Sequence, residues 1–138
     1  MLTPKIKEFI FERAGHLCEY CLSPMAFSSQ PYVGEHIIPT VKNGTDDVDN
    51  LASACGGCNG HKYTKTEALD PVTRKKVSLY HPRNMIWQEH FMWSDDFLNI
   101  LGITDIGRAT VQSLYLNRSG VVNIRRILLL DGKHPAQK

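Results

Sequence analysis

The alternation of apolar and polar residues predicts a helix at the start of the chain and short extended segments after it. Thr3 followed by Pro4 is a favourable helix start, and apolar residues then recur with helical spacing as far as Gly15. Residues 34–39 contain two adjacent isoleucines and end in a proline, which is typical of a short strand. Residues 40–50 are rich in turn-forming residues, and a short helix is expected to begin near Asn59.

The pattern changes in the second half of the chain. The polar run 70–76 predicts an exposed connection. The segment from Trp87 to Trp93 is rich in aromatic residues, which we expect to pack in the core rather than to stack on bases. Thr104 and Ser119 are candidate N-caps of two closing helices that continue through residues 114 and 128. We therefore expect a helical C-terminal part.

Length and composition narrow the possible classes. The 138 residues are enough for one compact domain, and the apolar content of 42% is ordinary for a globular protein. No apolar run approaches the roughly 20 residues that are needed to cross a bilayer, and the N-terminus does not resemble a signal peptide. We expect a cytoplasmic protein without membrane contacts, whose thiols are reduced and available to metal.

Charge is distributed unevenly along the chain. The net charge is only +2, but residues 1–70 carry 6 Lys/Arg against 9 Asp/Glu, whereas residues 71–138 carry 10 against 5. This asymmetry is compatible with a cation in the first half and a polyanion across the second, and equally with an ordinary solvated surface. Charge alone therefore favours nucleic acid only weakly.

Two C-x-x-C pairs carry the strongest chemical signal. Cys18 and Cys21 form the first pair, and Cys55 and Cys58 form the second. Two such turns supply four thiolates for a tetrahedral structural Zn²⁺. Two disulfides would need an oxidising compartment, and a redox pair would not need a second copy. The 33 intervening residues exceed the usual spacing of about 15–20 in simple four-cysteine modules, so a further segment is inserted between the two halves of the clamp.

The inserted segment resembles the zinc-clamped, stand-alone bacterial members of the HNH endonuclease family. The similarity runs through roughly residues 15–65, and it rests on Cys18-Glu-Tyr-Cys21, Gly34-Glu-His-Ile-Ile-Pro39, Asn43-Gly44, Asp49-Asn50-Leu51 and Cys55-Gly-Gly-Cys58-Asn-Gly-His-Lys62. Segments 84–91 and 107–110 are similar, more loosely, to the C-terminal extension of such proteins. The resemblance implies an α+β fold with a ββα-metal (His-Me finger) core. We expect one domain, 1–138, with the core in residues 1–66 and the extension in residues 67–138.

The same resemblance implies roles for individual residues. Glu35 and Asn59 correspond to ligands of a catalytic divalent cation, although many relatives have aspartate where this chain has Glu35. His36 corresponds to the general base, and Asn50 to the asparagine that ties down the loop and fixes the histidine. Asn50 and Asn59 are also compatible with turn and helix capping. A neutral imidazole suits water activation at physiological pH, and oxygen ligands suit Mg²⁺ or Mn²⁺, with Ni²⁺ or Zn²⁺ as further options.

The resemblance thus predicts a metal-dependent endonuclease that hydrolyses phosphodiester bonds in DNA. We expect double-stranded DNA to be held mainly through its phosphates, and RNA or branched DNA are also compatible. The basic residues expected to contact phosphates are Lys62, Lys65, Arg74, Lys75 and Lys76. The main alternative is a non-catalytic zinc module that binds nucleic acid or a protein partner, and a second is a pseudo-enzyme or a component whose partner supplies specificity.

Overall fold

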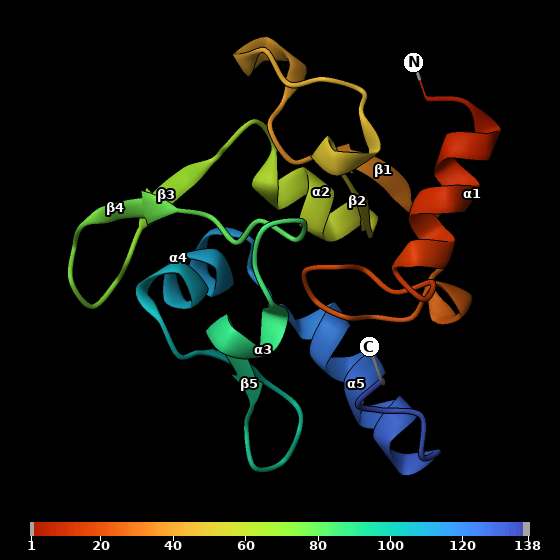
Figure 1. Cartoon of the computed structure of the whole chain (residues 1–138). Helices are drawn as coiled ribbons and strands as arrows, with labels where there is room; N and C mark the ends of the chain where they lie inside the picture. Colours follow the sequence, from red (N-terminus) through yellow and green to blue (C-terminus); the bar gives the residue numbers. More distant parts are fainter. Residues whose placement is uncertain (1, 137–138) are drawn as a thin grey trace.

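The computed structural model describes residues 2–136, which begin with the predicted N-terminal helix, α1 (Pro4–Arg13; Figure 1). The Thr3 hydroxyl caps it by accepting a hydrogen bond from the Ile6 N–H (3.2 Å), as predicted. In the last turn, the Arg13 guanidinium donates to the carbonyls of Val48 (3.0 Å) and Leu51 (2.7 Å). Helix α1 therefore fixes the segment that carries Asn50.

A two-stranded antiparallel hairpin follows, β1 (Val33–His36) with β2 (Leu51–Ala54), and His36 lies opposite Leu51. The prediction of a strand over 34–39 was wrong in extent, because β1 ends at His36. Beyond it, the Ile38 N–H donates to the Asn50 side chain (2.9 Å) instead of to a strand partner. The connection contains 3₁₀ helices at Thr40–Lys42 (η2) and Val48–Asn50 (η3), and another, Met25–Phe27 (η1), precedes β1.

Helix α2 (Gly56–Lys62) packs on β1 and completes a ββα unit. Its predicted start near Asn59 was wrong, because the helix begins at Gly56. The N-cap is Cys55, whose sulfur accepts the Cys58 N–H at 3.4 Å. A cysteine is not among the usual capping residues, so a search for conventional caps places the helix start too late.

The C-terminal part contains a second antiparallel hairpin, β3 (Glu67–Leu69) with β4 (Lys76–Ser78), which packs on α4. The prediction of an exposed connection over 70–76 was therefore only partly right. The side chain of Asp70 is buried, and Arg108 donates to its two carboxylate oxygens at 2.9 and 2.8 Å. The turn beyond Asp70 is exposed.

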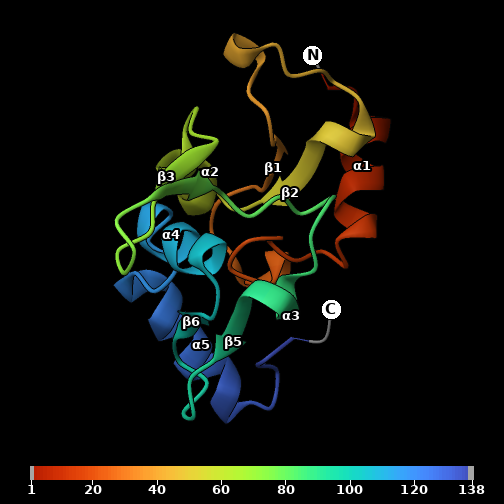
Figure 2. The same ribbon diagram turned by 60° about the vertical axis from the view of Figure 1, so that its left-hand side comes forward.

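The rest of the C-terminal part lies beneath the ββα unit in Figures 1 and 2. It consists of α3 (Trp87–His90), the hairpin β5 (Phe91–Trp93) with β6 (Ile100–Gly102), α4 (Asp105–Ser113) and α5 (Ser119–Leu130). Thr104 caps α4 as predicted, by accepting the Gly107 N–H at 3.0 Å. Ser119 does not cap α5, since Arg118 occupies that position. Trp87 and Phe91 are buried, as predicted, and Trp93 is partly buried against the core.

Polar contacts join this part to the turn of the first cysteine pair. The Trp87 indole N–H donates to the Tyr20 carbonyl at 3.0 Å, and the Arg83 guanidinium pairs with the buried carboxylate of Glu19. The other Glu19 oxygen accepts the Ser53 N–H of β2 (2.9 Å). The extension therefore supports the turn between Cys18 and Cys21 from outside. Among the described residues, no helix is long and apolar enough to span a membrane.

Candidate functional site

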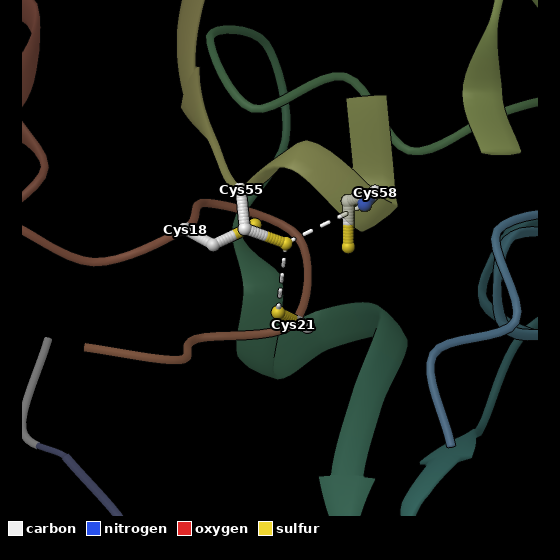
Figure 3. A group of neighbouring side chains, drawn as sticks. All are labelled: Cys18, Cys21, Cys55 and Cys58. Carbon is white, nitrogen blue, oxygen red and sulfur yellow. Dashed lines mark hydrogen bonds between the residues drawn. The ribbon is translucent and has the colours of Figure 1, made fainter. Parts of the chain in front are cut away.

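The four cysteines meet in one buried cluster between the turn after α1 and the start of α2 (Figure 3). Their ligand atoms all lie within 4.8 Å of one another, and the sulfurs of Cys21 and Cys55 are 3.8 Å apart. A tetrahedron with Zn–S bonds of about 2.3 Å has edges of about 3.8 Å. Since the donors, their burial and their spacing all suit Zn²⁺, the cluster fits a closed structural zinc site.

A cationic side chain from the extension lies against this cluster. Arg118 directs one nitrogen to the Cys55 sulfur (3.3 Å) and the other to the Cys58 sulfur (3.6 Å). Gly57 permits this approach, because a Cβ there would overlap the guanidinium. Burial opposes the charge of Arg118, but the nearby sulfurs raise its pKa above the ordinary value. A four-thiolate zinc site carries net negative charge, so Arg118 provides an outer-shell partner for it.

Glu35 lies on the inward face of β1, where its carboxylate contacts two protein groups. One oxygen is 2.6 Å from the Lys62 ammonium on α2, and the other accepts a hydrogen bond from the Tyr20 hydroxyl (2.7 Å). All three side chains are buried. Burial raises the pKa of Glu35, although the Lys62 charge opposes that shift. The structure thus places a protein cation against the carboxylate that the sequence assigns to a metal.

His36, the next residue, points to the other face of the strand, because successive side chains alternate. Its ring is partly exposed, at 27%, and Nε2 lies 2.7 Å from a carboxylate oxygen of Asp46. This contact lowers the pKa of the exposed Asp46 carboxyl. A carboxylate only accepts hydrogen bonds, so in the neutral ring Nε2 carries the proton and the Nδ1 lone pair is the basic one.

Asn50 fastens the two ends of the loop after β1. Its side-chain oxygen accepts the Ile38 N–H (2.9 Å), and its amide nitrogen donates to the carbonyls of Ile38 (3.0 Å) and Thr45 (2.8 Å). The loop is so tight at Gly44 that a Cβ there would overlap the Ile38 carbonyl oxygen. Asn50 therefore holds the loop that delivers Asp46 to the imidazole of His36.

Asn59 lies on α2, one helical turn before Lys62. Residues three apart share a helix face, so Asn59 and Lys62 lie on the same side of α2, and Lys62 contacts Glu35. The carboxylate and the amide thus come from adjoining parts of β1 and α2. These oxygen donors suit Mg²⁺ or Mn²⁺ chemically, and cation binding at Glu35 requires that the ammonium share or release the carboxylate.

The basic residues predicted to contact phosphates separate into two groups. The prediction for Lys62 was wrong for this conformation, because its side chain is only 1% exposed and bonds to Glu35 and to the Ile37 carbonyl (2.8 Å). Burying an ammonium is costly unless it is paired, and Glu35 supplies the pairing. Lys65 is partly exposed and lies near the Ser113 carbonyl (3.3 Å). The exposed basic residues of the second hairpin are Arg74, Lys75 and Lys76.

Sequence reasoning missed three residues that shape this region. The missed residues are Asp46, Tyr20 and Arg118, which contact His36, Glu35 and the cysteine sulfurs. Tyr20 lies inside the first C-x-x-C turn, where a buried phenol needs a partner, and that was an available signal. Asp46 was one of several acidic residues in a turn-rich loop, so no local pattern distinguished it.

Residues 18–65 match the family model described as HNH endonuclease. The match includes both cysteine pairs, β1, β2 and α2, so this segment forms an HNH domain with short helices and one small antiparallel sheet. The family resemblance and the α+β fold are thereby confirmed. No curated protein and no solved structure matches the chain.

Proposed function

We propose that this chain is a metal-dependent endonuclease that hydrolyses phosphodiester bonds in DNA, with His36 as the general base. HNH families are in general nucleases, and residues 18–65 form an HNH domain. The observation that carries the proposal is the contact between His36 and Asp46. It orients a partly exposed imidazole and leaves Nδ1 as its basic nitrogen, which is the state that a general base requires.

In the proposed reaction, a water attacks the phosphorus in line with the leaving 3′-oxygen. Nδ1 of His36 takes a proton from this water as the new P–O bond forms. The bond to the 3′-oxygen then breaks, and solvent protonates the leaving oxygen. Asp46 holds the ring and stabilises the imidazolium that results. Asn50 contributes by fixing the loop rather than by touching the reacting atoms.

Glu35 and Asn59 are the residues that we propose to hold the catalytic Mg²⁺ or Mn²⁺. Because Glu35 faces away from His36, its carboxylate must turn from Lys62 for the cation and the imidazole to act on one phosphate. When bound, such a cation polarises the scissile phosphate and stabilises the leaving oxygen. The buried pair of Glu35 with Lys62 has a consequence for affinity. Because the ammonium already compensates the carboxylate, we expect weak divalent binding to the free protein and tighter binding once a DNA phosphate adds its own oxygen ligands.

The second hairpin and Lys65 are the proposed DNA-contacting surface. The exposed residues Arg74, Lys75 and Lys76 project from one turn and strand of this hairpin, and Arg108 fixes its base through Asp70. Contacts of this kind position a duplex without reading its sequence. We therefore expect binding that weakens steeply with salt and shows little sequence preference.

Plasmid cleavage tests the proposal. Zinc-loaded protein is incubated with supercoiled plasmid and Mg²⁺ or Mn²⁺, in parallel with His36→Ala and Asn59→Ala. We expect nicking or linearisation by the wild type and little by either variant, with zinc content and circular dichroism unchanged. Chelation alone is no substitute, since it strips the structural ion too.

Two results would contradict the nuclease. Equal cleavage by wild type and variants indicates a contaminant or another base. Metal-independent DNA binding without cleavage under any divalent cation favours the alternative, a non-catalytic zinc module, which does not need an oriented imidazole.

A further inference from the structure

A hollow lies between α4 and the second hairpin, which is formed by β3 and β4. It has a volume of about 240 Å³ and is lined by Lys65, Ala68, Leu69, Gln112, Ser113 and Tyr115. None of these residues belongs to the zinc cluster or contacts His36. The lining combines an aromatic ring, aliphatic side chains, an amide, a hydroxyl and an ammonium. These are the groups that bind a flat heterocycle attached to an anionic backbone.

Tyr115 is held open to solvent at this hollow. Its side chain is 60% exposed, and its backbone has φ 51°, in the left-handed region that non-glycine residues rarely adopt. One side of the ring packs on His61 of α2, with centroids 4.7 Å apart. The ring is thus supported from α2 while it lines the hollow.

Positive charge is continuous with the hollow. Leu69 of β3 lines it and pairs directly with Lys76 of β4. Directly opposed residues of an antiparallel pair project to the same face, so the exposed Lys76 lies beside Leu69, a residue that lines the hollow. Lys65 itself lines the hollow, near the Ser113 carbonyl. A strand that enters the hollow therefore meets the Lys65 ammonium, and Lys76 lies next to one of the lining residues.

The hollow is also close to the proposed cleavage site. His61, which supports Tyr115, lies two residues after Asn59 on α2. Residues two apart lie on nearly opposite faces of a helix whose diameter with side chains is about 10–12 Å. The two positions are therefore separated by about the width of one helix.

We infer that this hollow binds an unpaired nucleotide, with its base against Tyr115 and its phosphates near Lys65 and Lys76. Resting on the proposed nuclease function, the inference specifies the substrate class: DNA with a bulged, forked or overhanging base near the scissile phosphate. Gln112 and Ser113 offer polar groups to the edge of the base. A fully paired duplex presents no such base and binds through its phosphates alone.

The inference is tested by binding without cleavage. Fluorescence anisotropy without added divalent cation compares zinc-loaded wild type on a blunt duplex and on the same duplex with one bulged base. A fluorescent adenine analogue at the bulge reports stacking. We expect tighter binding of the bulged duplex, with quenching of the analogue. Tyr115→Ala weakens that binding about tenfold, the loss expected for one stacked base, whereas Tyr115→Phe keeps it.

Tyr63→Ala is the matched control, because Tyr63 is 77% exposed at the end of α2 but does not line the hollow. Equal affinity for blunt and bulged duplexes, or equal losses in Tyr115→Ala and Tyr63→Ala, overturns the inference. The nuclease proposal is decided separately, by plasmid cleavage. Bulge-selective binding that depends on Tyr115 in a protein that never cleaves supports the inference and contradicts the nuclease.

Discussion

The cysteine cluster and the surroundings of His36 belong to the same HNH domain, but they differ in how completely protein side chains alone form the site. The four cysteine sulfurs are buried, converge within 4.8 Å and have Arg118 as an outer partner. Around His36, by contrast, the imidazole is partly exposed beside Asp46, and the neighbouring carboxylate of Glu35 is paired with Lys62 on the other face of β1. The first region resembles a closed structural site, whereas the second keeps a partly exposed imidazole accessible to water.

The largest loss of stability is expected when one cysteine sulfur of the zinc cluster is removed. Cys58→Ser takes a ligand from the closed site, and structural zinc contributes apparent free energies of roughly 10–16 kcal/mol in small domains. We therefore expect loss of bound zinc and of cooperative unfolding, measured by metal content and circular dichroism. Ser23→Ala, which alters only a neighbour of Cys21, is the control. A folded, zinc-free Cys58→Ser protein would show that the cluster does not hold the fold together.

Breaking the Glu35–Lys62 pair is expected to cause the next largest loss of stability. Lys62→Met leaves a buried carboxylate without its partner, which costs about 3–5 kcal/mol of unfolding free energy. Adding Glu35→Gln removes the stranded charge and should restore much of the loss in denaturant unfolding. Lys42→Met, at an exposed position before Asn50, is the control. If the double variant is as unstable as Lys62→Met, the ammonium is stabilising the fold through something other than Glu35.

The parts of the fold and of the site that could be predicted are those whose determining residues lie close together in the sequence. Thr3-Pro4, the C-x-x-C pairs and the order of Glu35, His36 and Asn50 lie within a few residues of one another, and the helix, the zinc cluster and the HNH domain followed from them. The assignments to His36, Glu35 and Asn59 as catalytic groups stay predictions, as does the division at residue 66.

What the sequence did not predict depends on contacts between distant segments. The burial of Lys62 depends on Glu35, 27 positions earlier, and Arg118 reaches sulfurs about 60 positions away. The strand β6 is only three residues long and is stabilised by pairing with β5, so its own residues carry little signal. The buried Asp70 looked like one more polar residue in a polar run until Arg108 reached it.

A smaller effect, on the zinc affinity of the cysteine cluster, is expected when Arg118 is replaced. Arg118→Gln removes the guanidinium that bonds to Cys55 and Cys58, and loss of an outer-shell partner typically lowers metal affinity by about 10–100-fold. Competition with a chromogenic chelator measures this, with Arg126→Gln on the exposed side of α5 as the control. Unchanged zinc affinity would mean that the extension contributes only packing to the cluster.

The smallest expected effect is a pH dependence of folding stability that arises from His81 in the extension. The ring nitrogen Nδ1 of His81 accepts hydrogen bonds from the backbone N–H groups of Arg83 (3.2 Å) and Asn84 (3.3 Å). The side chain of Arg83 in turn pairs with Glu19. Burial lowers the pKa of His81 in the folded protein. The unfolded chain therefore binds a proton first, near pH 6.5, and this contribution to stability is present above that pH and declines as pH falls below it.

His81→Asn tests this, because an asparagine oxygen accepts the same N–H groups but does not titrate. Thermal unfolding between pH 7.5 and 5.5 should decline less with acidification in His81→Asn than in the wild type, by a few degrees. Parallel curves for the two proteins would mean that protonation of His81 is not linked to folding.

The most direct measurement for the whole account is the single-turnover rate of plasmid nicking at matched zinc content. Wild type, His36→Ala and His16→Ala, an exposed histidine outside the site, are compared in Mg²⁺ or Mn²⁺. Loss of a general base typically costs about 10²–10⁴-fold in rate. We predict a loss of that size for His36→Ala alone, with His16→Ala close to wild type. Equal rates for wild type and His36→Ala, at equal zinc content and fold, would contradict the assignment of His36 as the base.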